Sequence, residues 1–188
     1  MKHLLALALI LCISLLSFAQ QFDGISISGD YNQAIERYKA KGYKVTKYDG
    51  NFTFMLGMVN GTQVELLLIG TLKTKQFCKA LVYLPKKSTW ESLKGNYQDY
   101  LSLLTTKYGK PSSSYSFFKE PYYEGDGYEL TAVKAEKCVY AAYWLEMLDN
   151  TSISLTISEY QQVQINYENE RLMELYKKEK DILNGNSF

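Results

Sequence analysis

The residues most capable of chemistry gather in one short segment, Glu120–Glu129, between two predicted strands. It holds four carboxylates, three tyrosines and two glycines. Carboxylate oxygens can bind a hard cation, and tyrosine rings can stack on a sugar or on a protein partner. The alternative, which we favour, is a hairpin loop whose glycines supply turn geometry and whose acids are solvated. The candidate binding residues are Tyr122, Tyr123, Glu124, Asp126, Tyr128 and Glu129.

The composition excludes most catalytic mechanisms. The only histidine is His3, which lies in the predicted signal peptide described below. The rest of the chain therefore cannot run a Ser-His-Asp or Cys-His mechanism, and it lacks the commonest zinc ligand. A glycosidase needs only two acids about 5–10 Å apart, and Glu124, Asp126 and Glu129 are the compact candidates. The sequence favours a protein that is not an enzyme, with no catalytic residue, no metal site and no cofactor.

Two cysteines, Cys78 and Cys138, follow the signal segment. In an oxidising compartment such a pair could form a disulfide. Both also fall in predicted strands, where a cysteine commonly behaves as a small buried apolar residue. Both interpretations stay open, with a slight preference for free, buried thiols.

The N-terminus has the three parts of a secretory signal peptide. Lys2 and His3 are positive, residues 4–16 are apolar, and small residues precede a cleavage site that we predict between Ala19 and Gln20. The apolar run is too short for the roughly 20 residues of a membrane-spanning helix. We therefore expect residues 20–188 to be a periplasmic or extracellular protein without a membrane span.

Loss of Lys2 would bring the formal net charge from +1 to about zero. The chain has no long basic run, so neither nucleic acid nor anionic lipid is a predicted partner. The partner left by the sequence is an unknown protein or cell-envelope ligand. The seventeen tyrosines are predicted to be mostly half-buried sheet residues with solvated hydroxyls.

Capping and turn signals predict an α+β fold. A helix begins after the N-cap Asp30 and ends at Gly42. Asp49-Gly50 and Asn60-Gly61 then separate apolar runs, as two-residue hairpin turns do, and a run over residues 74–84 completes a four-stranded meander. Ser88 and Glu91 predict a capping box for a second helix, which ends at Gly109.

The remaining chain is predicted to form further strands and a charged final helix over residues 168–184. The predicted strands are Ser113–Lys119, Tyr128–Lys134, Cys138–Met147, Ser152–Ile157 and Gln162–Tyr167. We therefore predict a single α+β domain over residues 20–188, with the helices on one face of a largely antiparallel sheet. The repeated order of elements indicates two tandem helix-plus-four-strand units, residues 22–85 and 86–167.

Several stretches are similar to a group of exported bacterial hypothetical proteins. They include the Phe-Ala-Gln end of the signal peptide, Leu84-Pro85 with Trp90 and Leu93, Lys107–Pro111 and Glu124–Glu129. This resemblance covers nearly the whole mature chain and implies no activity. The order of elements is also similar to β-lactamase-inhibitor-protein-like folds, whose two repeats bind other proteins on the concave face of the sheet. No inhibitor-specific residue matches, so that likeness implies only a fold.

The leading functional hypothesis is a non-catalytic periplasmic or secreted binding module. Its contacts would come from a tyrosine-rich open sheet face and from the Tyr122–Glu129 loop, because aromatic rings are enriched where proteins bind one another. One alternative is a carbohydrate-active enzyme that uses acids alone. The other is a carrier that holds a small apolar ligand between helices and sheet.

Overall fold

The structure is a computed structural model that describes residues 21–147 and 150–185. The predicted signal peptide and its cleavage site at Ala19 and Gln20 lie outside these residues. Four helices are described: α2 (Tyr31–Ala40), α3 (Trp90–Tyr108), α4 (Glu129–Lys134) and α5 (Glu170–Leu183). The strands are β1 (Gln21–Phe22), β2 (Ile25–Ser26), β3 (Lys44–Asp49), β4 (Phe52–Val59), β5 (Thr62–Gly70), β6 (Phe77–Tyr83), β7 (Ser113–Phe118), β8 (Cys138–Met147), β9 (Thr151–Ser158) and β10 (Gln162–Asn169).

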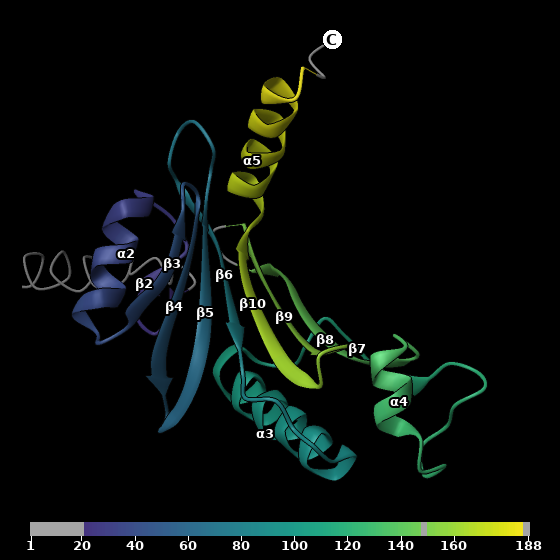
Figure 1. Cartoon of the computed structure of the whole chain (residues 1–188). Coiled ribbons are helices and arrows are strands. Elements are labelled where there is room, and N and C mark those ends of the chain that lie inside the picture. The colour runs from purple at the N-terminus through teal and green to yellow at the C-terminus, as the bar shows by residue number, and fades with distance from the viewer. Residues whose placement is uncertain (1–20, 148–149, 186–188) are drawn as a thin grey trace, which may run out of the picture.

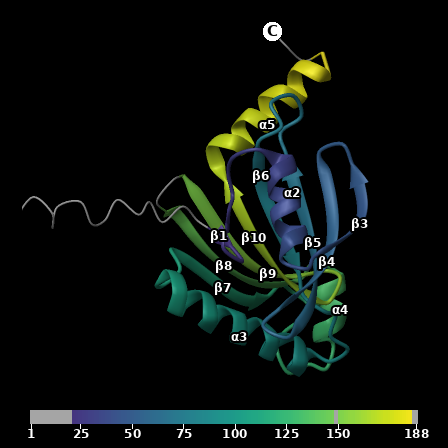
Figure 2. The same ribbon diagram turned by 90° about the vertical axis from the view of Figure 1, so that its left-hand side faces the viewer.

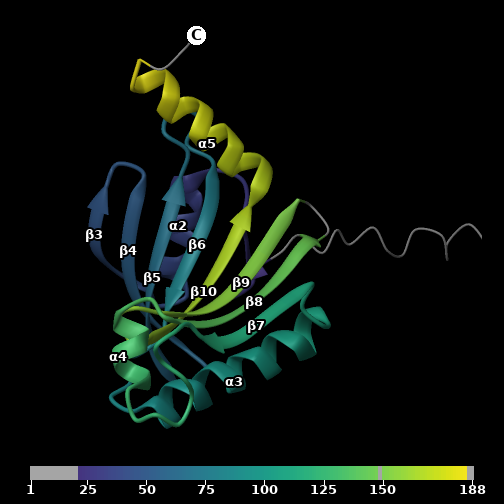
Figure 3. The same cartoon turned by 90° about the vertical axis from the view of Figure 1, so that its right-hand side faces the viewer.

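The main sheet joins two meanders side by side. Its strand order is β3-β4-β5-β6-β10-β9-β8-β7, and all neighbours are antiparallel. The last strands of the two meanders, β6 and β10, pair at the centre (Figure 3). The predicted α+β fold with an antiparallel meander sheet is therefore confirmed. Each meander follows a helix of its own, α2 or α3, so the order helix plus four strands occurs twice.

One face of this sheet carries the core. A single row of directly paired residues runs across six strands, and every member of the row is buried. The row consists of Thr53, Leu68, Ala80, Tyr167, Ile153 and Trp144. Directly paired residues of antiparallel strands share a face, so both meanders bury the same side. Helices α2 and α3 lie on that side (Figure 2).

The tyrosines depart from the expected half-buried sheet positions. Six are almost completely buried in the core: Tyr31, Tyr38, Tyr43, Tyr97, Tyr140 and Tyr167. Three of these six are helical rather than in strands. Buried hydroxyls need partners: that of Tyr31 lies 2.7 Å from Thr53 Oγ1, and that of Tyr38 donates to the Phe22 carbonyl at 3.3 Å. Much of the tyrosine surplus thus serves packing.

One predicted strand and one predicted helix cap are wrong. Tyr128–Lys134 is not a strand, because Glu129–Lys134 forms the short helix α4 and buries the adjacent residues Ala132 and Val133. Alternation places neighbouring residues on opposite faces of a strand, whereas a helix can turn two neighbours toward one core. The second helix is capped by Thr89 rather than Ser88.

The predicted first helix is confirmed, including its caps. The carboxylate of Asp30 accepts the Gln33 N–H at 2.8 Å, and Gly42 has φ of 92° just past the helix end. The hairpin between β4 and β5 is also as predicted, since Asn60 and Gly61 both have positive φ. The first hairpin is shifted by one residue, because Asp49 pairs with Phe52 and leaves Gly50 and Asn51 as the loop.

The two cysteines are free and buried. Strands β10 and β9 lie between β6 and β8 in the sheet. Three strand-to-strand steps place the axes of β6 and β8 about 14 Å apart. The pairing register places Cys78 in the row of Met147, at the opposite end of β8 from Cys138. A disulfide requires Cα atoms within about 7 Å, so the disulfide interpretation is wrong for a single chain.

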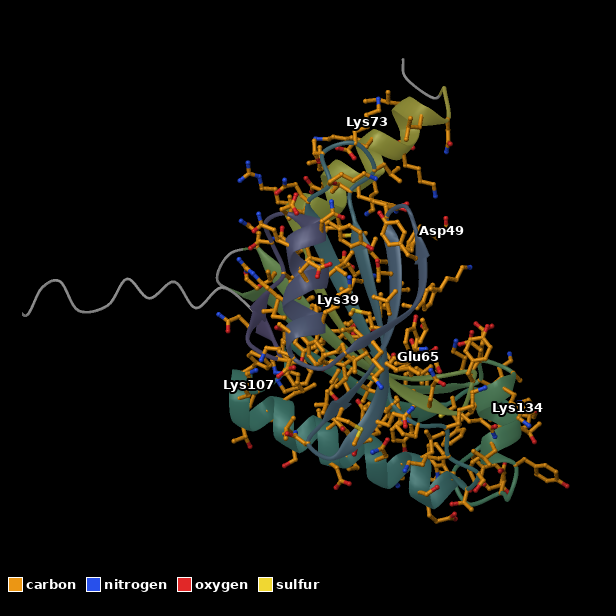
Figure 4. The ribbon with its side chains drawn as sticks, turned by 60° about the vertical axis from the view of Figure 1, so that its left-hand side comes forward. Lys39, Asp49, Glu65, Lys73, Lys107 and Lys134 are labelled. Atoms are coloured by element: carbon orange, nitrogen blue, oxygen red, sulfur yellow. The ribbon has the colours of Figure 1, made fainter. Side chains whose placement is uncertain are left out.

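Helix α5 leaves the end of β10 and extends beyond the sheet (Figure 1). Asn169 caps it, and its one buried residue is Glu179. That carboxylate accepts the backbone N–H groups of Lys73 at 2.6 Å and Thr74 at 3.1 Å, in the β5–β6 loop. Lys73 is labelled beside the helix in Figure 4. None of the helices within the described residues has the length and apolarity needed to cross a lipid bilayer.

Candidate binding surface

The predicted loop is held largely by its own acids. Asp126 accepts the backbone N–H groups of Tyr123 at 3.1 Å and Tyr128 at 2.7 Å, and Glu129 accepts that of Gly125 at 2.7 Å. Carboxylates that accept backbone N–H groups in this way define a turn. Residues 21–147 and 150–185 contain no group of three or more histidines, cysteines or acids that could hold a metal ion.

Glu124 ties the loop to the helical side of the sheet. It forms an ion pair with Lys94 of α3 and accepts the Tyr140 hydroxyl at 3.2 Å. The hydrogen bond from Lys94 is the main reason why the pKa of Glu124 is lowered. Burial, followed by the charge of Glu124, raises the pKa of Tyr140. The carboxylate of Glu124 is therefore an anchor between the loop and α3.

The loop and the open sheet face do not form one surface. Tyr140 lies on the core face of β8, in step with Ala142 and Trp144, and Lys94 is on α3. The anchored loop consequently lies on the helical side. Of the six predicted residues, Tyr123 and Tyr128 present most surface, with 66% and 63% exposure. Tyr122 packs partly against the core.

The opposite face of the sheet is left open by α2 and α3. Along β6, β9 and β10, fully buried residues alternate with half-buried ones, and the half-buried residues belong to this open face. Figure 3 looks onto it, with α2 behind the strands. Figure 4 shows Glu65, which belongs to the open face, on the other side of the sheet from Lys39 of α2.

The open face has an apolar region on each side of a polar centre. On β4–β6 it carries Phe54, Leu56, Leu67, Leu81 and Tyr83, and on β7 and β8 it carries Tyr115, Phe117, Val139 and Tyr143. Between them, β10 and β9 present Gln164, Asn166, Ser154 and Thr156. The residues of these two apolar regions and of the polar centre together make up the open face. The flanking regions can bury apolar area, and the centre offers amide and hydroxyl groups that both donate and accept hydrogen bonds.

Charge is sparse and compensated at the centre of the open face. Lys79 and Glu168 form an ion pair of 2.8 Å between β6 and β10. The side-chain oxygen of Asn166 has no hydrogen-bond partner within the described residues. A shallow groove of about 480 Å³ lies at one end of the face, beside Glu65, Tyr83 and Lys86. Burial is the first cause that raises the pKa of Tyr83, followed by Glu65.

These arrangements bear on the two alternative functions. An acid-only glycosidase needs two carboxylates that face a bound sugar. Here Asp126 and Glu129 accept backbone N–H groups of the loop, and Glu124 is bound to Lys94 of α3 and Tyr140 of β8. The three acids therefore serve the structure of the loop rather than a sugar site. A carrier needs a cavity between helices and sheet, but that layer is filled by large buried side chains such as Tyr31, Tyr38 and Tyr97. A larger groove, of about 750 Å³, lies elsewhere, between α5 and the segment before α2.

Comparison of the chain with protein-family models, curated proteins and solved structures found no match. The functional argument therefore depends on the surface itself. The sequence hypothesis included an open sheet face but named no residue on it. The missing information was strand register: once the Asn60-Gly61 turn and one buried row are fixed, alternation assigns every other residue of β4 and β5 to the open face.

Proposed function

We propose that this chain is a non-catalytic, exported binding module whose open face binds another protein. The observation that carries the proposal is the division of this face into two apolar regions and a polar, nearly uncharged centre. Interfaces of non-obligate protein complexes combine apolar anchor residues with hydrogen-bonding groups and few unpaired charges. The partner that fits is a protein surface with apolar side chains on both sides of an exposed stretch of backbone.

The polar centre favours backbone as its ligand. Gln164, Ser154 and Thr156 offer both donors and acceptors without net charge, which matches the alternating N–H and C=O groups of a polypeptide. The charged residues beside this polar centre, Lys79 and Glu168, are paired with each other, so the centre offers no free charge to a strongly charged partner. The anchors would be Tyr83 on one side and Tyr143 on the other, because aromatic residues carry much of the energy of protein interfaces.

Site-directed photo-crosslinking in the producing cell would test the proposal. A photoreactive residue is placed at Tyr83, at Tyr143, at Tyr123 in the loop, or at Lys39 on the outer side of α2. We expect one and the same protein to be crosslinked from Tyr83 and Tyr143, and not from Lys39. Crosslinks from Tyr123 alone would instead locate binding in the loop and contradict the proposal.

Binding of the purified partner gives the quantitative test. Tyr143→Ala is expected to weaken the affinity by about tenfold or more, as the loss of an aromatic anchor does in protein interfaces. The matched control is Tyr123→Ala, which removes an exposed tyrosine from the helical side and should leave affinity unchanged. An unchanged affinity for both Tyr83→Ala and Tyr143→Ala would refute the open face as the binding site.

A further inference from the structure

The two edge strands of the sheet differ in how they are protected from pairing. Strand β3 is exposed along its whole length but carries Lys44, Lys47 and Asp49, and its register shifts between Val45 and Lys47. Charges and bulges on an edge prevent it from pairing with another chain. Strand β7 has the sequence Ser-Ser-Tyr-Ser-Phe-Phe, with no charge, proline or register shift along its six pairs with β8.

The outer side of β7 is ready to accept a strand. Just past its end, the Lys119 N–H donates to the Lys137 carbonyl at 2.7 Å. Successive residues of an antiparallel strand direct their backbone groups to opposite sides, so Ser114, Ser116 and Phe118 direct theirs away from β8. Ser114 and Ser116 are also exposed, and the contact of α3 with this strand includes Trp90 against the ring of Phe118 at its end.

The same strand exposes two aromatic side chains on the open face. Tyr115 is 48% exposed and Phe117 is 46% exposed. Two large rings beside an unpaired, uncharged edge are a liability for a protein that remains a monomer. An occupant of this edge must satisfy the outward backbone groups and cover both rings.

We propose that β7 pairs antiparallel with β7 of a second copy of this chain, about a two-fold axis at Ser116. In that register Ser116 faces its own symmetry mate, and Ser114 faces Phe118 of the other copy. These three residues are the ones whose backbone groups point outward, so the pairs can form hydrogen bonds. Tyr115 of each copy then faces Phe117 of the other, at non-hydrogen-bonded positions where side chains lie closest.

The occupant is a second copy because the edge is complementary to itself. The axis at Ser116 pairs both rings with rings, and no charged residue of β7 meets a like charge, because β7 has none. A two-fold interface uses the same patch on both subunits. The resulting dimer would join two main sheets edge to edge and bring the β7 sides of two open faces together. Tyr115 and Phe117 also belong to the open face, so the dimer shares these two rings with the proposed partner site, but the inference rests on the β7 edge and not on the partner.

The oligomeric state of the purified protein tests the proposal. Sedimentation and light scattering over a concentration series are expected to give a dimer for the natural sequence and a monomer for Ser116→Lys, which opposes two ammonium groups at the axis. The matched control Thr46→Lys adds the same charge to the exposed edge β3 and should remain a dimer. Circular dichroism melting checks that both variants are folded.

A cysteine placed at the axis tests the register. Cα atoms of a hydrogen-bonded antiparallel pair lie about 5.5 Å apart, within the range that a disulfide spans. Ser116→Cys should therefore give a covalent dimer on oxidation, whereas Thr46→Cys on β3 should not. The proposal is overturned if the natural sequence is a monomer, or if folded Ser116→Lys remains a dimer. It is also overturned if Thr46→Lys on β3 dissociates the dimer. Failure of Ser116→Cys to crosslink within a dimer would overturn the proposed register at Ser116.

Discussion

The two halves of the sheet share an order of elements but differ in how closely aromatic rings approach the strand backbone. In the first half, aromatic rings lie directly against strand backbone: the ring of Tyr31 covers Gly70, and that of Tyr43 covers Gly57. Rings of this half also pack on one another, since Tyr38 of α2 lies edge-on against Tyr43 and Phe77. In the second half, strands β7–β10 contain no glycine, and α3 packs through ring contacts. Trp90 and Tyr97 of α3 both contact the ring of Tyr140 edge-on, with centroids 5.1 Å and 5.5 Å away.

The same order of elements therefore occurs in both halves although the residues that pack their helices differ. A helix needs only an apolar stripe to cover a meander, and either solution supplies it. A glycine in a strand lets a ring lie directly against the backbone, whereas rings over strands without glycine pack against other side chains. The two solutions predict different sensitivities to substitution, and the following variants test that contrast.

The largest effect is expected at the strand glycines of the first half. In Gly70→Ala the new Cβ would lie 2.6 Å from Cγ of Tyr31, a ring that is itself held by hydrogen bonds to Thr53 and Leu68. Overpacking of this kind costs about 1–3 kcal/mol. Denaturant unfolding of Gly70→Ala should show that loss in the free energy of unfolding.

The second half supplies the matched control. Gly95 of α3 has open space where a Cβ would be added. Gly95→Ala is therefore expected to raise the free energy of unfolding by about 0.5–1 kcal/mol, since alanine is a better helix former. If both alanine variants shift stability in the same direction, the proposed contrast in packing is wrong.

The sequence predicts features of this fold that are decided by residues close together along the chain. Local signals identified the Asp30 cap, the Asn60-Gly61 turn and the four strands of the first meander, because each is decided within a few residues. The register of the first hairpin was missed by one residue: Gly50 occupies the first loop position, which a type II′ turn also favours. A one-residue change of this kind moves every side chain to the other face.

Long-range features were beyond the sequence pattern. The junction of β6 with β10 brings together strands about eighty residues apart, and no local signal specifies it. The anchoring of Glu124 to Lys94 and Tyr140 likewise depends on tertiary contacts, so the loop looked like part of a binding surface. Gly57 and Gly70 did carry a usable signal, because a glycine inside a strand often marks a close approach.

The next largest effect concerns the buried tyrosine hydroxyls. Tyr31→Phe leaves the fully buried Thr53 hydroxyl without its partner, and an unsatisfied buried group costs about 1–3 kcal/mol. Tyr140→Phe in the second half should cost less, because its partner Glu124 keeps the ion pair with Lys94. Thermal and denaturant unfolding would measure both variants.

A double variant separates the hydrogen bond from packing. Tyr31→Phe with Thr53→Val removes both polar partners and should recover most of the loss, since replacing both partners can be nearly neutral. If the double variant is as unstable as Tyr31→Phe alone, the Tyr31 hydroxyl stabilises the fold through packing against its neighbours rather than through the hydrogen bond to Thr53.

A smaller, pH-dependent effect is expected where α5 meets the first half. Burial alone would raise the pKa of Glu179, but N–H donors from Lys73 and Thr74 outweigh it and lower the pKa. A carboxylate with a lowered pKa stabilises the fold above its unfolded pKa, and that stability is lost as the pH falls through the folded pKa. Acid should therefore loosen α5 from the β5–β6 loop.

Amide NMR can follow this step. The Lys73 and Thr74 N–H resonances should shift together as Glu179 is protonated, with a midpoint below that of an ordinary glutamate. Glu179→Gln should abolish the shift, whereas Glu124→Gln, at the anchor of the second half, should leave it in place. A midpoint at or above the ordinary glutamate value would contradict the assigned hydrogen bonds.

The smallest difference expected between the halves is in thiol reactivity. Burial raises the pKa of both Cys78 and Cys138 to about 12, so little reactive thiolate exists near neutral pH in either half. Cys78 is fully buried and its thiol donates to the Ile69 carbonyl at 3.2 Å, whereas Cys138 is 9% exposed at the start of β8. Timed alkylation of the folded protein should therefore label Cys138 first, and unfolding in denaturant should make the two rates equal. Faster labelling of Cys78 would mean that the centre of the first half opens more readily than the start of β8, the reverse of what the packing implies.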